Sequence, residues 1–275
     1  MNTLKQENAM EDVAALIDDI LKMFSSAKMP HLANVNLYLG IPYTILSVFH
    51  EALTLQRSKD ESERFRNRMR YAGIFKERTE NTFKWDDNTY PHACPGVIEQ
   101  ALTIDFIRQK RNLVMSGPTG AGKSLLAVII ACKALREDFS VKYKTAHDIV
   151  TELQEARSGN SLTGYIKRMQ AYDVLVIEDI TFSSPDSKTS QDFFSIIDKR
   201  YERKTTIVTT NGNIKKWIKD FSDNSLWAGL LGRLYQEAIL INMNDAEDMR
   251  VKWAKGFLDS MGSGDVAVNE SGIGD

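Results

Sequence analysis

The sequence has few of the residues that build disulfide frameworks and metal sites. It contains two cysteines, Cys94 and Cys132, and four histidines in 275 residues. The cysteines lie far apart in the sequence, so a disulfide framework and a four-cysteine zinc site are both excluded. His92 lies two residues from Cys94 and could supply half of a metal site, but the sequence has no second pair of ligands to complete it.

Long hydrophobic runs and an excess of one charge are also missing. No run approaches the roughly 18 apolar residues that span a bilayer, and the N-terminus lacks a signal-peptide pattern, so we expect a cytoplasmic protein with no membrane partner. The 35 basic and 37 acidic residues give a net charge of −2, which argues against binding nucleic acid by bulk charge. That total averages a basic segment, 64–78, with six basic residues and one acidic residue, and the acidic residues 259–275.

The residue pattern divides the chain into four parts. Apolar residues spaced by three and four predict a helical N-terminal domain over 1–63. Residues 64–94 follow as a basic arm or linker, whose arginines lie either on a solvated helix with a buried apolar stripe or on an arm that grips phosphates. From 95 to 258, β-branched runs alternate with helical stretches, which is typical of a parallel α/β sheet covered by helices. Residues 259–275 are rich in glycine and acids, and we expect a disordered tail.

Five strands are expected in the third part, at 112–116, 140–145, 173–178, 205–210 and 238–243. The first of them is followed by a match to the phosphate-loop pattern G-x-x-x-x-G-K-[ST] and then by a helical run. Glycines let such a loop turn its backbone N–H groups toward phosphates, the lysine reaches the β- and γ-phosphates, and the helix N-terminus favours the same anion. The sequence therefore predicts an ATP site formed by Gly117, Pro118, Thr119, Gly120, Ala121, Gly122, Lys123 and Ser124.

Polar residues follow the third and fourth expected strands. Glu178 and Asp179 end a fully apolar strand, and Asn211 ends the next one. The carboxyl ends of parallel strands meet beside a phosphate loop, where Mg²⁺ and the attacking water are held. We therefore expect Lys123, Glu178, Asp179 and Asn211 to be catalytic and Ser124 with Glu178 to bind Mg²⁺. Without the loop, the two acids would be an ordinary strand end and the asparagine a turn residue.

These segments together resemble the IstB/DnaC group of AAA+ ATPases, and the insertion-sequence branch of that group more than the helicase loaders. The similarity runs from about residue 64 to residue 250. It includes the arginine-rich stretch that ends in Tyr-Ala-Gly-Ile, the phosphate loop and the acids of the third strand, and it is carried by residues 64–74, 117–124, 141–150, 174–179, 200–211, Trp217 and 230–234.

The resemblance implies an AAA+ P-loop NTPase fold with a five-stranded parallel sheet, self-association into a ring or filament, and an ATP site shared between neighbouring subunits. Arg233 corresponds to the arginine finger that acts in the next subunit's site, although Arg200 or Arg203 could take that role or lie on the surface. Arg250 either contacts the γ-phosphate in place of a lid arginine or forms a surface salt bridge, since too few residues remain for a separate lid. At the end of the third strand, family members usually carry Asp followed by Asp or Glu. This chain has Glu178 followed by Asp179, so we expect slow ATP hydrolysis with ATP binding intact.

Three functions compete for this ATP site. A small-molecule kinase would need a second substrate-binding signature, which the sequence does not show. A transposition helper would oligomerise on duplex DNA, deform it and recruit a transposase; the alternative, a helicase loader, would hold a replicative helicase and sense single-stranded DNA. The similarity favours the transposition helper. Both need basic residues that contact phosphates without reading sequence, and the candidates are Arg64, Arg66, Arg68, Arg70, Lys142, Lys144, Arg157, Lys167, Arg168, Lys215, Lys216 and Lys219.

Overall fold

The structure is a computed structural model that describes residues 2–29, 31–82, 95–180, 187–211 and 225–244. The chain divides into two compact units, Met1–Asn67 and Arg68–Asp275. The boundary falls four residues beyond the expected one, inside helix α2 (Tyr43–Ala72). This helix runs from the expected N-terminal domain into the expected arm without a break, because no glycine or proline interrupts it. None of the helices in the described ranges is long and apolar enough to cross a bilayer.

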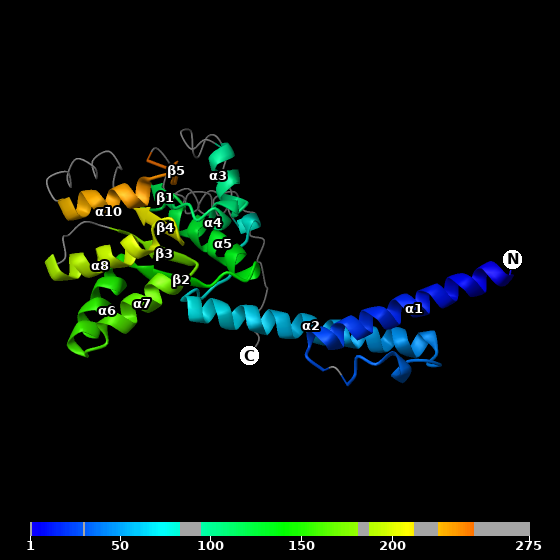
Figure 1. Cartoon of the computed structure of the whole chain (residues 1–275). Helices are drawn as coiled ribbons and strands as arrows, with labels where there is room; N and C mark the ends of the chain where they lie inside the picture. Colours follow the sequence, from blue (N-terminus) through cyan, green and yellow to red (C-terminus); the bar gives the residue numbers. More distant parts are fainter. Residues whose placement is uncertain (1, 30, 83–94, 181–186, 212–224, 245–275) are drawn as a thin grey trace, which may run out of the picture. The chain divides into compact units, whose positions relative to one another are not determined.

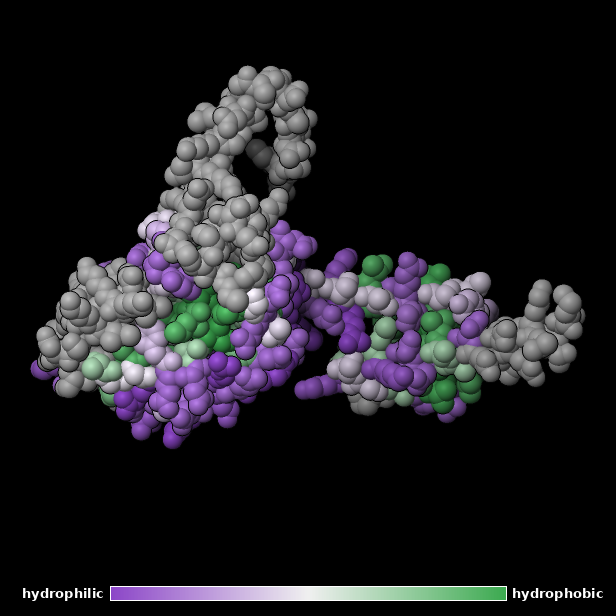
Figure 2. Space-filling model, turned by 90° about the horizontal axis from the view of Figure 1, so that it is seen from above, coloured by the Kyte–Doolittle hydropathy of each residue, from purple (hydrophilic) through white to green (hydrophobic). Residues whose placement is uncertain are grey.

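The first unit contains helix α1 (Asn2–Ser26), the short helix η1 (Val35–Leu37) and the first part of α2. Its core is small and consists of the buried side chains of Ile17, Ile20, Phe24, Tyr38 and Leu46. Hydrophobic side chains also reach the surface of this unit, where green and purple regions lie side by side in Figure 2. The exposed ones include Val35, Leu37, Leu39, Tyr43, Ile45, Val48 and Leu55.

The second unit is built on a five-stranded parallel sheet, as predicted (Figure 1). The strands lie in the order β2-β3-β4-β1-β5, so β2 and β5 form the edges. Each begins and ends within one residue of its expected position, and their bounds are Leu113–Ser116 for β1, Val141–Thr145 for β2, Val174–Glu178 for β3, Thr205–Thr210 for β4 and Ile239–Asn242 for β5. The fully buried β1 and β4 lie side by side, which brings the phosphate loop next to the end of β4.

Helices cover both faces of the sheet (Figure 1). Helix α5 (Lys123–Arg136) packs on one face, with α3 (Pro95–Leu102) and α4 (Asp105–Arg108) on the same side. The other face carries α6 (Ala146–Ser158), α7 (Leu162–Ala171), α8 (Ser187–Arg200) and α10 (Ser225–Tyr235). Alternate residues of a strand point to opposite faces, so Leu175 and Ile177 of β3 join the apolar cluster of these four helices.

The end of α2 is anchored to the sheet, where we had expected an arm or linker. Gly73, with a φ of +89°, ends the helix in a Schellman motif, in which its N–H donates to Arg70 O and the next N–H to Met69 O. A Cβ atom on Gly73 would lie 2.8 Å from Tyr143 O of β2, so only glycine permits this approach. Arg68 pairs with Asp138 at 2.5 Å. Phe65 and Met69 are buried, which confirms the apolar stripe. The helix is followed by η2 (Glu80–Thr82).

Candidate ATP site

The phosphate loop joins β1 to α5 and depends on glycine at three points. A Cβ atom on Gly117 would lie 2.7 Å from Met243 O and 2.8 Å from Met243 Cβ, so the first glycine of the motif packs against the chain beyond β5. Gly120 and Gly122 have φ values of +86° and +88°, which other residues rarely adopt. Gly122 is also the N-cap of α5 and offers no side chain to cap its first turn. An uncapped helix start of this kind suits an anion.

A chain of polar contacts links three of the predicted catalytic residues. The Lys123 side chain is buried, and its Nζ donates to Gly117 O at 2.6 Å, to Pro118 O at 2.8 Å and to Asn211 Oδ1 at 2.9 Å. Asn211 Nδ2 in turn donates to Asp179 Oδ1 at 2.5 Å. The loop and the ends of β3 and β4 therefore meet in one site, and they present an amine, an amide and a carboxylate to its centre.

Glu178 lies at the end of β3 and is partly buried. Its Oε2 accepts a hydrogen bond of 2.9 Å from the hydroxyl of Tyr143 on β2. Burial, the charge of Glu178 and this hydrogen bond raise the pKa of Tyr143. Tyr143 was not among the predicted site residues, although it lies within segment 141–150, which resembles the family. The hydrogen bond from Tyr143 on the outer strand β2 therefore restrains the Glu178 carboxylate.

The backbone of Asp179 has a φ of +53°, and β4 supports this turn. Asp179 N donates to Thr209 Oγ1 at 3.0 Å, and Ile180 N donates to Thr209 O at 3.0 Å. The Thr210 hydroxyl donates to Ile180 O at 3.1 Å. Thr209 and Thr210 were also missed; their position directly before Asn211 is the only signal in the sequence. These bonds fix the direction of the Asp179 carboxylate.

The donor set fits a magnesium ion that is held mainly by nucleotide phosphates. Ser124 supplies an exposed hydroxyl, and Glu178 and Asp179 supply carboxylates. Over the described ranges no group of three or more histidine, cysteine, aspartate and glutamate side chains could hold a metal on its own. Mg²⁺ in ATPases is typically bound by one or two carboxylates together with substrate phosphates.

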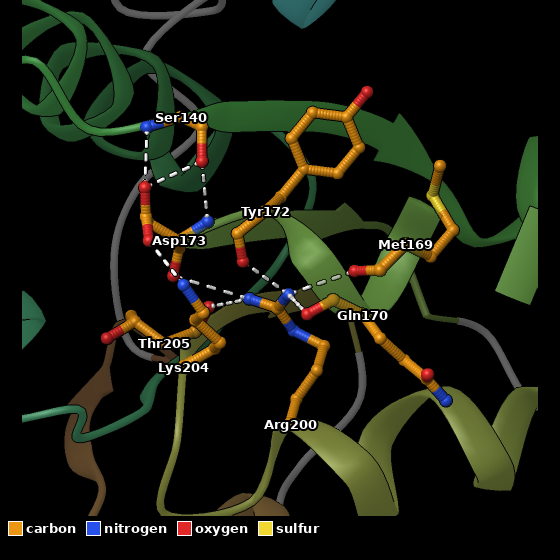
Figure 3. A network of polar contacts seen from close by, with 8 residues as sticks. All are labelled: Ser140, Met169, Gln170, Tyr172, Asp173, Arg200, Lys204 and Thr205. Carbon is orange, nitrogen blue, oxygen red and sulfur yellow. Dashed lines mark hydrogen bonds and ion pairs between the residues drawn. The ribbon is translucent and has the colours of Figure 1, made fainter. Parts of the chain in front are cut away.

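The structure separates the arginines that competed for the finger role. Arg200 is 1% exposed and donates to backbone oxygens of five residues and to the Thr206 hydroxyl, as Figure 3 shows for the backbone contacts. It cannot reach another subunit, so that alternative is wrong. Arg203 is exposed, and Arg233 is partly exposed on the last turn of α10. Arg250 lies outside the described residues.

Several of the predicted DNA-contacting residues have partners within the protein. Lys142 Nζ donates to Tyr71 O at 2.7 Å, and burial and the charge of Lys144 lower the pKa of Lys142. Lys144 pairs with Glu152, Arg157 with Asp192 and Arg68 with Asp138. Arg64, Arg66, Arg70, Lys167 and Arg168 are exposed, whereas Lys215, Lys216 and Lys219 lie outside the described residues.

Three of these cations line one groove. Lys142 and Lys144 of β2 and Arg168 of α7 border a groove with a volume of about 510 Å³. Its walls also contain Tyr165, over whose ring the Arg168 guanidinium lies at 5.9 Å from the centroid. Glu152 and Glu155 line the same groove, so its charge is mixed.

The fold and the site define a P-loop ATPase of the AAA+ class. The model of the family described as IstB-like ATP binding protein matches residues 45–255, and the chain belongs to this family. It is 32% identical over 171 residues to the ATP-binding protein of insertion sequence IS232 from Bacillus thuringiensis, covering 62% of this chain and 68% of that protein. For the corresponding IS21 protein of Pseudomonas aeruginosa the identity is 25% over 169 residues, covering 62% and 63%.

Solved structures show the same fold. AMPPCP-bound DnaA from Aquifex aeolicus superposes with a TM-score of 0.52 at 20% identity and covers 67% of this chain and 55% of that one. Domain III of DnaA from Thermotoga maritima gives a TM-score of 0.51 at 16% identity, covering 69% and 76%. At these identities the likeness concerns the fold alone.

Proposed function

We propose that this ATPase is a transposition helper that oligomerises on duplex DNA in an ATP-dependent manner, deforms the DNA and recruits a transposase to it. The observation that carries the proposal is the meeting of Lys123, Asn211 and Asp179 at the carboxyl edge of the sheet, in a chain whose relatives are named as ATP-binding proteins of insertion sequences. The chain spans about two thirds of the length of these relatives.

Each residue of the site has a distinct part in this proposal. Lys123 exchanges its loop carbonyls for phosphate oxygens, and Asn211 passes from Lys123 and Asp179 to the γ-phosphate. Asp179 orients the attacking water, and Ser124 with Glu178 holds Mg²⁺, which neutralises phosphate charge when it is bound. Because the carboxylate at the metal-binding position is a glutamate and the one at the water-polarising position is an aspartate, we expect slow turnover with intact ATP binding.

Arg233 completes the site of a neighbouring subunit in this proposal. Its guanidinium would stabilise charge that develops on the γ-phosphate, and such arginines contribute roughly 10³ to 10⁵ in rate in related reactions. A subunit that hydrolyses ATP only with its neighbour's arginine requires assembly, so the turnover per subunit should rise with protein concentration. Constant turnover per subunit over a wide dilution range would contradict the shared site.

DNA binding is tested by fluorescence anisotropy with a labelled duplex, with and without ATP, across a series of salt concentrations. We expect ATP-dependent, weakly sequence-selective binding that weakens as salt rises, because phosphate contacts release counterions. Replacing Lys167 and Arg168 by alanine should reduce the slope of log affinity against log salt by up to about 2. Lys199→Ala removes an exposed lysine of α8 outside the predicted set and should leave the slope unchanged. Equal affinity with and without ATP would refute the proposal.

The partner is identified by co-purification with the protein encoded in the neighbouring reading frame. Capture of a transposase on ATP-loaded protein supports the proposal. Preference for single-stranded over duplex DNA, together with capture of a replicative helicase, would instead establish the helicase-loader alternative.

A further inference from the structure

The side chain of Arg233 is held in place by three contacts within its own subunit. Its Nε lies 2.7 Å from Asp198 Oδ1 on α8. Its Nη1 donates to Gly229 O, one turn earlier in α10, at 3.0 Å. Its guanidinium carbon lies 4.9 Å from the centroid of the Phe194 ring, also on α8. The arginine is therefore bound along one edge and over one face.

The outer edge of the guanidinium, which carries Nη2, is open. An arginine carries five N–H donors; Nε faces Asp198 in an ion pair, and one proton of Nη1 bonds to Gly229 O. In the described part of the chain, Nη2 has no hydrogen-bond partner, and the side chain remains 35% exposed. The remaining donors form the fork that binds a phosphate in two places. Asp198 thus occupies the stem side of the guanidinium and leaves its outer edge for a ligand.

Glycine at position 229 leaves space for this arrangement. A Cβ atom there would lie 3.4 Å from Arg233 Nη1 and 3.5 Å from the ring of Phe194. Both are ordinary van der Waals distances, so the guanidinium and the ring pack directly beside Gly229. The arginine therefore contacts three residues outside the ATP site of its own subunit, Phe194, Asp198 and Gly229.

We propose that Asp198 is a positioning residue for Arg233: its carboxylate fixes the guanidinium so that the open edge enters the ATP site of the neighbouring subunit. This inference rests on the proposed function, in which Arg233 acts on that site. The carboxylate has two opposite effects. It reduces the positive charge that the phosphate meets, and it removes the rotational freedom of a long side chain, which otherwise costs free energy when the arginine is ordered in the transition state. Asp198 and Arg233 are each 35% exposed, so water screens the charge effect, and the loss of freedom is the larger one.

Two substitutions separate these effects. Asp198→Asn removes the charge but keeps an oxygen that can accept from Nε, whereas Asp198→Ala removes both. If Asp198 positions the arginine, the alanine variant loses about tenfold in kcat with an unchanged KM for ATP, and the asparagine variant stays within about threefold of the wild type. Asp105→Ala breaks an exposed pair with Arg108 on α4 and serves as the matched control, with unchanged kcat. If both Asp198 variants equal or exceed the wild type, the proposal is overturned.

A mixing experiment tests whether the effect acts between subunits. Subunits with Asp179→Asn have no hydrolysis of their own but carry an intact Arg233. Added to the Asp198→Ala protein, they supply a correctly held arginine to its intact ATP sites, so turnover per Asp198→Ala subunit should rise several-fold. No rise would show that the substitution damages its own subunit's site or fold, and would overturn the proposal.

Arg233→Ala keeps this test distinct from the test of the proposed function. In the same mixture it should lose activity alone and regain it with the Asp179→Asn subunits. If it keeps full activity alone, or is not rescued, Arg233 is not the shared arginine and the proposed function fails at that point. If it behaves as expected while the Asp198→Ala protein is active without help, only the positioning inference fails.

Discussion

Replacing Arg200 by methionine should destabilise the second unit without changing the geometry of the ATP site. Arg200 is buried beside Asp173 and Thr205, where β3 and β4 begin (Figure 3). In a parallel sheet this end lies opposite the phosphate loop, which follows the carboxyl end of β1. Burial lowers the pKa of its guanidinium to about 9, despite the opposing effect of Asp173, so the group is still charged at pH 7. It donates to the backbone oxygens of Met169 at 2.9 Å, Gln170 at 3.4 Å, Tyr172 at 2.6 Å, Asp173 at 3.4 Å and Thr205 at 2.5 Å.

The magnitude follows from the acceptors that the substitution leaves behind. Met169 O, Gln170 O and Tyr172 O lie at the C-terminal end of α7, where the last carbonyls of a helix have no partner within the helix. Each unsatisfied buried acceptor costs about 1–3 kcal/mol. Removing the buried cation relieves its own desolvation and offsets part of this sum. We therefore expect a net loss of about 3 kcal/mol in the free energy of unfolding, near the lower end of the sum, and a fall in Tm of about 6–12 °C for a unit of this size.

Thermal and denaturant unfolding of the full chain, followed by circular dichroism, measures this loss. Arg203→Met is the matched control, because Arg203 is exposed three residues away, and its substitution should change the free energy of unfolding by less than about 0.5 kcal/mol. At a temperature where both variants are folded, their ATPase rates should equal that of the wild type. An Arg200→Met protein as stable as the control would refute the reasoning about the orphaned carbonyls.

Three further changes probe the site and its support. Gly117→Ala forces a Cβ atom into backbone 2.7 Å away and should abolish binding of a fluorescent ATP analogue, whereas Gly96→Ala, with open space around it, should bind normally; equal binding by both would contradict the close approach. Although burial opposes it, hydrogen bonds from the neighbouring lysine and serine lower the pKa of Asp173 to about 2. Its unfolded value is about 3.9, so its contribution to stability is present above about pH 4 and is lost as the pH falls toward 2. The stability difference between the wild type and Asp173→Asn should shrink over that range, and a difference independent of pH would exclude this origin. Tyr143→Phe removes the hydrogen bond to Glu178 and should raise the Mg²⁺ concentration needed for half-maximal ATPase activity with little change in Tm; an unchanged Mg²⁺ dependence would show that the bond does not hold the metal ligand.

The parts of the protein that the sequence predicted well are those encoded by local spacing. The phosphate loop is a continuous run of eight residues in the sequence. Two of its glycines adopt a left-handed φ, and the third packs closely against Met243. The strands were placed within one residue because short apolar β-branched runs are bounded by polar residues. The meeting of Asn211 and Asp179 with Lys123 could be predicted because the carboxyl ends of parallel strands lie at the same end of a sheet. That prediction needs no knowledge of the packing around these residues.

The roles of single arginines and lysines could not be predicted in the same way. Arg200 and Arg203 lie three residues apart in one polar segment, yet one is buried under five carbonyls and the other is exposed. The difference arises from α7, whose end lies against Arg200 only in the folded chain. Lys144 and Arg157 were likewise predicted to contact DNA, whereas each has a carboxylate partner that tertiary packing supplies.

Strand β2 places different polar side chains on the two faces of the sheet. Its residues alternate between the faces of the sheet, so Lys142 and Lys144 share the face that carries α6 and α7 and border the groove there. Tyr143 points to the face that carries α5, and its hydroxyl reaches Glu178. The parallel register with β3 pairs Thr145 with Glu178, which places Tyr143 diagonally before that carboxylate on the same face. A shift of this edge strand along β3 would therefore displace both the hydrogen bond to Glu178 and the lysines of the groove.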